Sequence, residues 1–191
     1  MSKAIKITLT KAEGEHDIAA SKLFGAPVLP EGWEDEMSDE VIFFGQIRLS
    51  DIAPFDPENR LPHTGYLYLF LDTEIYPYTA MIQYHDCEPR LVIDNFNELE
   101  PRFAHLNKDF LMTFEEADED YDGTKLFGVP SSEPADLDDY ELLLQFDPLD
   151  NETGFLSEID GYAYFFFGKG TEDRMENPIF HAGARFEIDR S

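Results

Sequence analysis

Three aspartates alternate with other residues immediately before a glycine. Asp118, Asp120 and Asp122 match ligand positions 1, 3 and 5 of a calcium-binding EF-hand loop. Gly123 follows at position 6, where such loops turn sharply. The pattern then departs, because position 12 is Val129 instead of a bidentate glutamate. The motif predicts at most a weak Ca²⁺ site, and a solvated acidic turn is the alternative; no other cofactor is expected.

Two glutamines lie inside apolar stretches that are typical of buried strands. They are Gln46 and Gln145. A buried amide has several donor and acceptor sites, and leaving one unpaired costs about 1–3 kcal/mol. One interpretation is that each side chain bonds to the backbone of the glycine-containing loop that precedes it. The other is that both glutamines line a shared cleft, where Asp147 and Asp160 would add polar groups that bind a ligand.

His85 and Cys87 are the pair that best matches nucleophilic chemistry. Residues two apart share a strand face, and a thiolate beside a histidine can attack a carbonyl group. Asp86 would point to the opposite face, so no acid orients the histidine. The 41 acidic residues make any carboxylate pair uninformative, and no Gly-x-Ser-x-Gly elbow occurs. A non-enzymatic protein is favoured, and a hydrolase is the weakest alternative.

The chain is strongly acidic. Its 41 Asp and Glu residues oppose 14 Lys and Arg residues, which gives a net charge of -27. Such a field repels phosphate groups, so nucleic acids and anionic membranes are disfavoured as partners, whereas cations and basic proteins are attracted. Residues 31–40 and 115–141 concentrate acidic side chains before the two glutamine-containing stretches. They predict one negative surface that speeds association with a basic partner, and solubility alone is the alternative explanation.

Three short blocks recur in the same order, roughly 100 residues apart. Residues 22–27 return as 125–130, residues 43–47 as 142–146, and residues 65–70 as 161–166. Two copies indicate a duplicated unit, because a solenoid needs at least three short repeats. We expect a single domain over residues 1–191, with repeat one at about 21–114 and repeat two at about 123–191.

Strand patterns outnumber helical ones along the chain. Strands are predicted at residues 4–9, 41–49, 65–72, 80–85, 110–114, 142–146, 161–167 and 184–188. Both faces of residues 65–72 are apolar, so both are expected to be covered. A short helix at residues 97–100 is predicted to be limited by Pro101. The predicted fold class is α+β, mainly antiparallel β and internally duplicated, with short helices and long ordered loops.

Targeting and disulfide signals are missing from the sequence. Cys87 is the only cysteine, so an intrachain disulfide or a cysteine zinc site is impossible. The N-terminal residues lack the apolar region of a signal peptide, and no stretch approaches the ~20 apolar residues of a membrane helix. The expected protein is soluble and cytoplasmic.

The ordered blocks resemble the bacterial YwqG-like family, which has no assigned biochemical function. The resemblance rests on residues 21–30, 44–47, 61–62 and 65–70 in the first half, and on 125–128, 142–147, 160–161 and 165–166 in the second. Where the family usually has two glycines, this chain has Phe24-Gly25 and Phe127-Gly128, and of a family Trp-Gly-Asp motif it keeps only Asp160. The resemblance implies a duplicated α+β fold and supplies no catalytic residues.

Three functional hypotheses follow from these observations. The leading one is an acidic, non-enzymatic interaction protein whose partner is basic, such as a toxin or nuclease that it neutralises. The second is a module that binds a small ligand or divalent cation in the cleft between the repeats. The third is a hydrolase.

Overall fold

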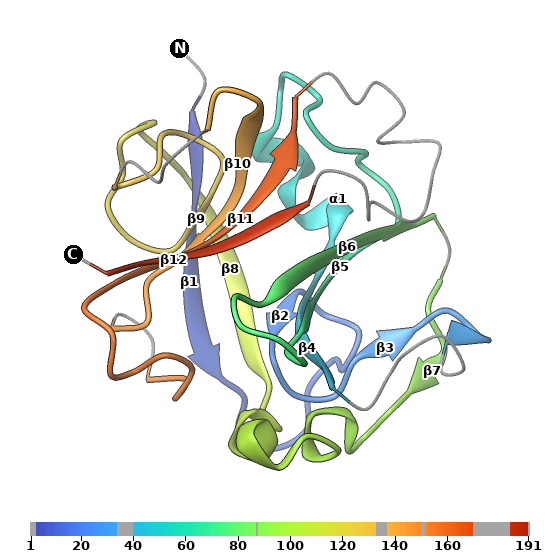
Figure 1. Ribbon diagram of the computed structural model, residues 1–191. Coiled ribbons are helices and arrows are strands. Elements are labelled where there is room, and N and C mark those ends of the chain that lie inside the picture. Colours follow the sequence, from blue (N-terminus) through green and yellow to red (C-terminus); the bar gives the residue numbers. More distant parts are fainter. Residues whose placement is uncertain are drawn as a thin grey trace.

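The fold is a strongly curved, mainly antiparallel sheet. A computed structural model describes residues 3–33, 40–86, 88–132, 137–149, 152–169 and 184–190. Within these residues, ten strands form one sheet that curls into a nearly closed barrel, and two short strands form a separate ladder at its side (Figure 1). The helices are short, and none in the described part of the chain is long and apolar enough to cross a membrane.

The eight longer strands of the described chain match the predicted segments closely, whereas the two-residue strands were not predicted. The first half contains β1 (Ala4–Lys11), β2 (Lys22–Leu23), β3 (Val28–Leu29), β4 (Val41–Arg48), β5 (Tyr66–Asp72), β6 (Thr79–His85) and β7 (Leu91–Val92). The second half contains β8 (Phe110–Ala117), β9 (Lys125–Leu126), β10 (Tyr140–Phe146), β11 (Gly161–Gly168) and β12 (Arg185–Arg190). The helices are α1 (Leu49–Ile52) and the 3-10 helices η2 (Ala53–Phe55), η3 (Phe96–Glu98) and η4 (Pro101–Leu106).

The two sides of the sheet show the same succession of short and long strands when each is followed outward from the centre. The strand order runs β12-β11-β10-β9-β1-β8-β2-β4-β5-β6, and neighbouring strands in this order pair antiparallel. From the central β1–β8 pair, each side continues with a two-residue strand, a long strand and two further long strands. Both β4 and β10 carry an irregularity at corresponding places, between Phe43 and Gly45 and between Leu142 and Leu144.

Both faces of the β4–β5 pair are covered, as the apolar pattern predicts. Phe44 and Leu69 belong to the large cluster inside the barrel, together with side chains from both halves. Phe43 and Tyr68 belong to a second cluster on the outer face, which β3 and η3 help to cover. Residues 28–33 and 91–96 therefore cover the outside of this half of the sheet.

The barrel core is built around aromatic rings from both halves. The ring of Phe44 lies 5.7 Å from that of Phe146 and 4.8 Å from that of Phe165, between centroids. It also lies 5.0 Å from Phe24 and 5.4 Å from Phe155. These five side chains are buried, so neither half has an interior of its own.

One predicted helix boundary is wrong. Pro101 was expected to limit a helix, but η3 ends at Glu98 and Pro101 is the first residue of η4. Proline is well tolerated there because its missing N–H would have no partner in the first helical turn. The Glu100 side chain caps the new helix by accepting a hydrogen bond from the Arg102 amide.

Candidate functional site

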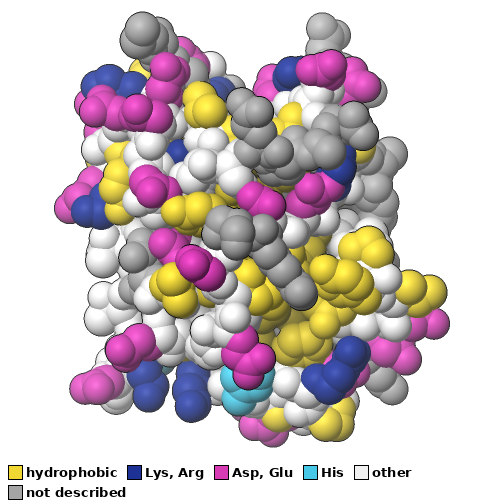
Figure 2. Space-filling model, turned by 60° about the vertical axis from the view of Figure 1, so that its left-hand side comes forward, with side chains coloured by type: hydrophobic (Ala, Val, Ile, Leu, Met, Phe, Trp, Pro, Cys, Tyr) yellow, Lys and Arg dark blue, Asp and Glu magenta, His cyan; other side chains and the backbone are white. Residues whose placement is uncertain are grey.

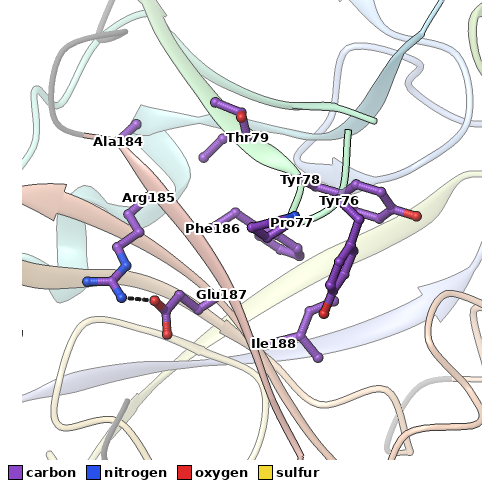
Figure 3. Close-up of a pocket in the computed structure, with 10 residues that line it drawn as sticks. Tyr76, Pro77, Tyr78, Thr79, Ala184, Arg185, Phe186, Glu187 and Ile188 are labelled. Atoms are coloured by element: carbon purple, nitrogen blue, oxygen red, sulfur yellow. Dashed lines mark ion pairs between the residues drawn. The ribbon is translucent and has the colours of Figure 1, made fainter. Parts of the chain in front are cut away.

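A pocket lies where the two ends of the sheet meet. β6 and β12 are the end strands of the described sheet, and they contact each other without pairing (Figure 1). Between them is a pocket of about 520 Å³, lined by residues 76–80 and 184–188 (Figure 3). We call this region the seam. A volume of this size falls within the usual range of ligand pockets.

Across the seam, the β6 side and the β12 side of the described chain are linked by aromatic side chains instead of backbone hydrogen bonds. The rings of Tyr78 and Phe186 stack with centroids 6.5 Å apart and planes 22° apart. Phe103 from η4 contacts the other side of this group, at 6.1 Å from Tyr78. Phe186 also contacts Phe165 in the barrel core at 5.1 Å. The floor of the seam is therefore continuous with the core.

The rim of the seam is apolar and exposed. Ile75 is 71% exposed and Tyr76 is 61% exposed, and the two are adjacent in the chain. Hydrophobic side chains also gather on one face of the molecule, bordered by charged side chains of both signs (Figure 2). On β12, Arg185 and Glu187 form an ion pair at the edge of the pocket (Figure 3). Apolar surface gathered beside a polar rim is typical of an interaction site.

The two glutamines are held by the protein itself. The Gln46 Oε1 accepts from the Val28 amide at 3.0 Å, and its Nε2 donates to the carbonyls of Ile18 and Ala20 at 3.2 and 3.0 Å. The Gln145 Oε1 accepts from the Ser131 amide at 2.9 Å. Its Nε2 donates to Gly123 O and Ser131 Oγ at 2.9 and 2.8 Å. This geometry matches the interpretation in which each amide fastens the loop before its own strand.

The two glutamines lie on strands that are not neighbours in the sheet, and each side-chain amide bonds within its own half of the chain. Along the described part of the sheet, four strands separate β4 from β10. Asp147 caps a turn by accepting from the Leu149 amide at 2.9 Å, and Asp160 is exposed just before β11. None of Gln46, Gln145, Asp147 and Asp160 lines the seam.

Replacing Gln145 with methionine tests its structural role. The change keeps the side-chain length but leaves the Ser131 amide and the Gly123 carbonyl without this partner, so unfolding should become easier by about 1–3 kcal/mol. Urea unfolding measures the loss. The matched control is Leu144→Met in the same strand, which should cost less than about 1.5 kcal/mol. Equal losses for the two variants would contradict the assignment.

The acidic motif before Gly123 is organised around a lysine. The carbonyl oxygens of Glu119 and Tyr121 accept from the buried Lys125 ammonium, as does that of Val129 at 2.7 Å. The Asp122 side chain accepts from the Tyr162 hydroxyl, which lowers the pKa of that carboxyl. Among the residues that the structure describes, no three His, Cys, Asp or Glu side chains group closely enough to hold a metal ion. Asp118, Asp120 and Asp122 therefore do not converge on one point.

The predicted nucleophile cannot be placed. Cys87 lies outside the described residues, as do residues 34–39 and 133–136 of the two acidic segments. His85 ends β6, where its ring lies 5.5 Å from that of Trp33. Among the described residues, its buried Nδ1 finds no hydrogen-bond partner.

The sequence interpretation missed a pair of buried lysines at equivalent positions. Lys22 and Lys125 are both fully buried. The Lys22 ammonium lies 2.9 Å from Asp109 Oδ2, and that oxygen lies 2.8 Å from His16 Nε2. Burial lowers the pKa of Lys22 despite the attraction of Asp109, whereas the hydrogen bond to Asp109 raises the pKa of His16. Lysine is rarely buried, so only the repetition of its position could have signalled this.

A glycine three residues after each buried lysine leaves room for a group that binds the lysine ammonium. Gly25 has φ +73°, and a Cβ there would lie 1.7 Å from Asp109 Oδ1. Gly128 has φ +81°, and a Cβ would lie 2.4 Å from the Glu119 carbonyl oxygen. Both glycines adopt a positive φ, which lets each loop close over a buried charge.

Arg60 links the two halves of the chain. The Arg60 guanidinium, from the loop after η2, lies 3.8 Å above the centre of the Phe127 ring. It also bonds to the buried Asp56 Oδ1 at 3.1 Å and to the Lys3 carbonyl at 3.0 Å. Burial alone would raise the pKa of Asp56, but the Leu61 amide and Arg60 outweigh it and the pKa is lowered.

No protein-family model matches the chain, and no curated protein matches it at a significant level.

Proposed function

We propose that this protein is an acidic, non-enzymatic interaction module that binds a basic polypeptide, such as a toxin or nuclease that it neutralises. The observation that carries the proposal is the seam. There an exposed apolar rim lies beside the end strands of a chain with net charge -27. Nucleic acids and membranes are not the proposed partners, because the same charge repels them. The proposed location is the cytoplasm.

The charge and the apolar rim would have different tasks in binding. A field of one sign raises the rate at which an oppositely charged partner arrives, and complementary charges suppress wrong partners. Affinity then comes chiefly from a few buried aromatic anchors. Tyr76 and Tyr78 are the aromatic side chains at the seam that are suited to that second task.

The proposed architecture is one domain made of two repeats, at about 21–114 and 123–191, as in the YwqG-like family. The symmetric strand order and the matching irregularities in β4 and β10 support this duplication. The matching pairs Lys22/Lys125 and Gln46/Gln145 support it as well, since each pair is buried at corresponding places.

Selection from a random twelve-residue peptide library tests the function without assuming a partner. The immobilised protein should enrich peptides rich in lysine and arginine that also contain apolar residues. Counter-selection on poly-glutamate removes peptides that bind to negative charge alone. Enrichment of neutral or acidic peptides, or no enrichment, would contradict the proposal.

A further inference from the structure

We propose that the seam binds an extended basic segment of the partner by strand addition, with lysine or arginine alternating with apolar residues. This inference rests on the proposed function and specifies where and how the partner docks. Strand addition supplies affinity through backbone hydrogen bonds and specificity through pockets for alternate side chains.

The end strands provide the backbone groups. In an antiparallel sheet, alternate residues of a strand direct their N–H and C=O groups toward the same side. β6 pairs with β5, and β12 pairs with β11, so the opposite edge of each faces the seam. In the described chain these two edges do not pair with one another. Proteins usually protect such edges, because they are templates for an added strand.

The seam also provides an apolar surface beside those edges. Tyr76, Tyr78, Phe186 and Ile188 line one pocket, and in Figure 3 Tyr76 and Ile188 lie close together at one end of it. Successive side chains of an extended segment point to opposite faces. Every second side chain of the segment would therefore rest on this surface, while the others would point toward solvent and the acidic exterior.

Charge identifies the added segment as basic. Two copies of this chain would each bring a net charge of -27, so self-association through the seam is opposed by repulsion. At the pocket itself Glu187 is paired with Arg185, so the attraction comes from the net charge of the chain and from Glu74, which is exposed just before the apolar rim. Aromatic rings next to the seam already carry cations: Arg102 lies over Phe103 and Arg185 over Tyr140, each 5.4 Å from the ring centre. An exposed tyrosine offers an incoming cation the same interaction.

Two single substitutions separate the seam from the general charge. Tyr76→Lys places a cation on the rim, and Leu149→Lys makes the same charge change at a residue that is 60% exposed and does not line the seam. The probe is a ten-residue peptide of alternating lysine and valine, titrated by calorimetry. Tyr76→Lys should weaken binding about tenfold or more, because it removes an aromatic anchor and repels the peptide. Leu149→Lys should change it less than about twofold.

Each outcome of this comparison is decisive. Equal weakening by the two variants would overturn docking at the seam but leave a basic partner in place. No binding of the peptide to the unaltered protein, together with a failed library selection, would overturn the proposed function itself. Sedimentation of the protein alone should give a monomer; a dimer that Tyr76→Lys dissociates would assign the seam to a second copy and overturn the inference.

Discussion

Replacing Asp109 with alanine should lower the free energy of unfolding by about 3–5 kcal/mol, because it leaves a buried lysine ammonium without its charged partner. The Lys22 side chain is fully buried, and Asp109 is the carboxylate that it contacts. The same change removes the acceptor of the Ala26 amide and the partner of His16. Urea unfolding followed by circular dichroism measures the loss.

A double-mutant cycle shows whether the unpaired charge is the cause. Lys22→Met combined with Asp109→Ala should recover most of the loss, since an apolar side chain has no charge to leave unpaired. Glu116→Ala, which removes a carboxylate from an exposed pair with Lys3, should lower the stability far less than Asp109→Ala does. A double variant no more stable than Asp109→Ala alone would refute this explanation.

Replacing Phe44 with alanine should cost about 3–5 kcal/mol and weaken both halves together. Phe44 is in the first half, but two of its four aromatic neighbours, Phe146 and Phe165, are in β10 and β11. The cavity would open at the point where the halves share their core. Fluorescence of Trp33, the chain's only tryptophan, and circular dichroism should therefore report the same unfolding transition.

The adjacent Phe43 provides a matched control. It is equally buried, but it faces the outer cluster and contacts Phe70 of the same half. Phe44→Ala and Phe146→Ala should couple by about 0.5–3 kcal/mol, as is usual for residues in contact. Phe43→Ala and Phe146→Ala should be additive to within about 0.5 kcal/mol. Separate transitions for the two probes, or no coupling between Phe44 and Phe146, would show that the halves are independent.

Most of the strands could be predicted because apolar residues occupy them so consistently. β5 is the clearest case, since alternation of Tyr66, Tyr68 and Phe70 with leucines required two covered faces. The structural role of the paired glutamines was one of the two interpretations that the sequence offered, and it followed from the need of a buried amide for local partners.

The acidic residues that follow the predicted strand 110–114 show where local patterns mislead. The sequence predicts a strand that ends at residue 114, but β8 continues to Ala117. Glu115 and Glu116 lie in the strand opposite β1, where they pair with Lys6 and Lys3. Cross-strand charge pairs outweighed the low strand propensity of glutamate, and they join residues more than a hundred positions apart.

The seam was not foreseen for a related reason. Residues 75–78 carry no strand or helix pattern, and their aromatic side chains become a site only when β12 lies beside them. The buried lysines depend likewise on distant partners, such as Asp109 for Lys22. Contacts between segments far apart in the chain leave no periodic signal in either segment.

Amide hydrogen exchange, measured with and without the alternating lysine–valine peptide, tests strand addition at the seam most directly. Binding should slow exchange in β6 or β12, where half of the amides face the seam, and leave the central strands β1 and β8 unchanged. Protection confined to other acidic surfaces, with unchanged exchange in β6 and β12, would contradict the proposal.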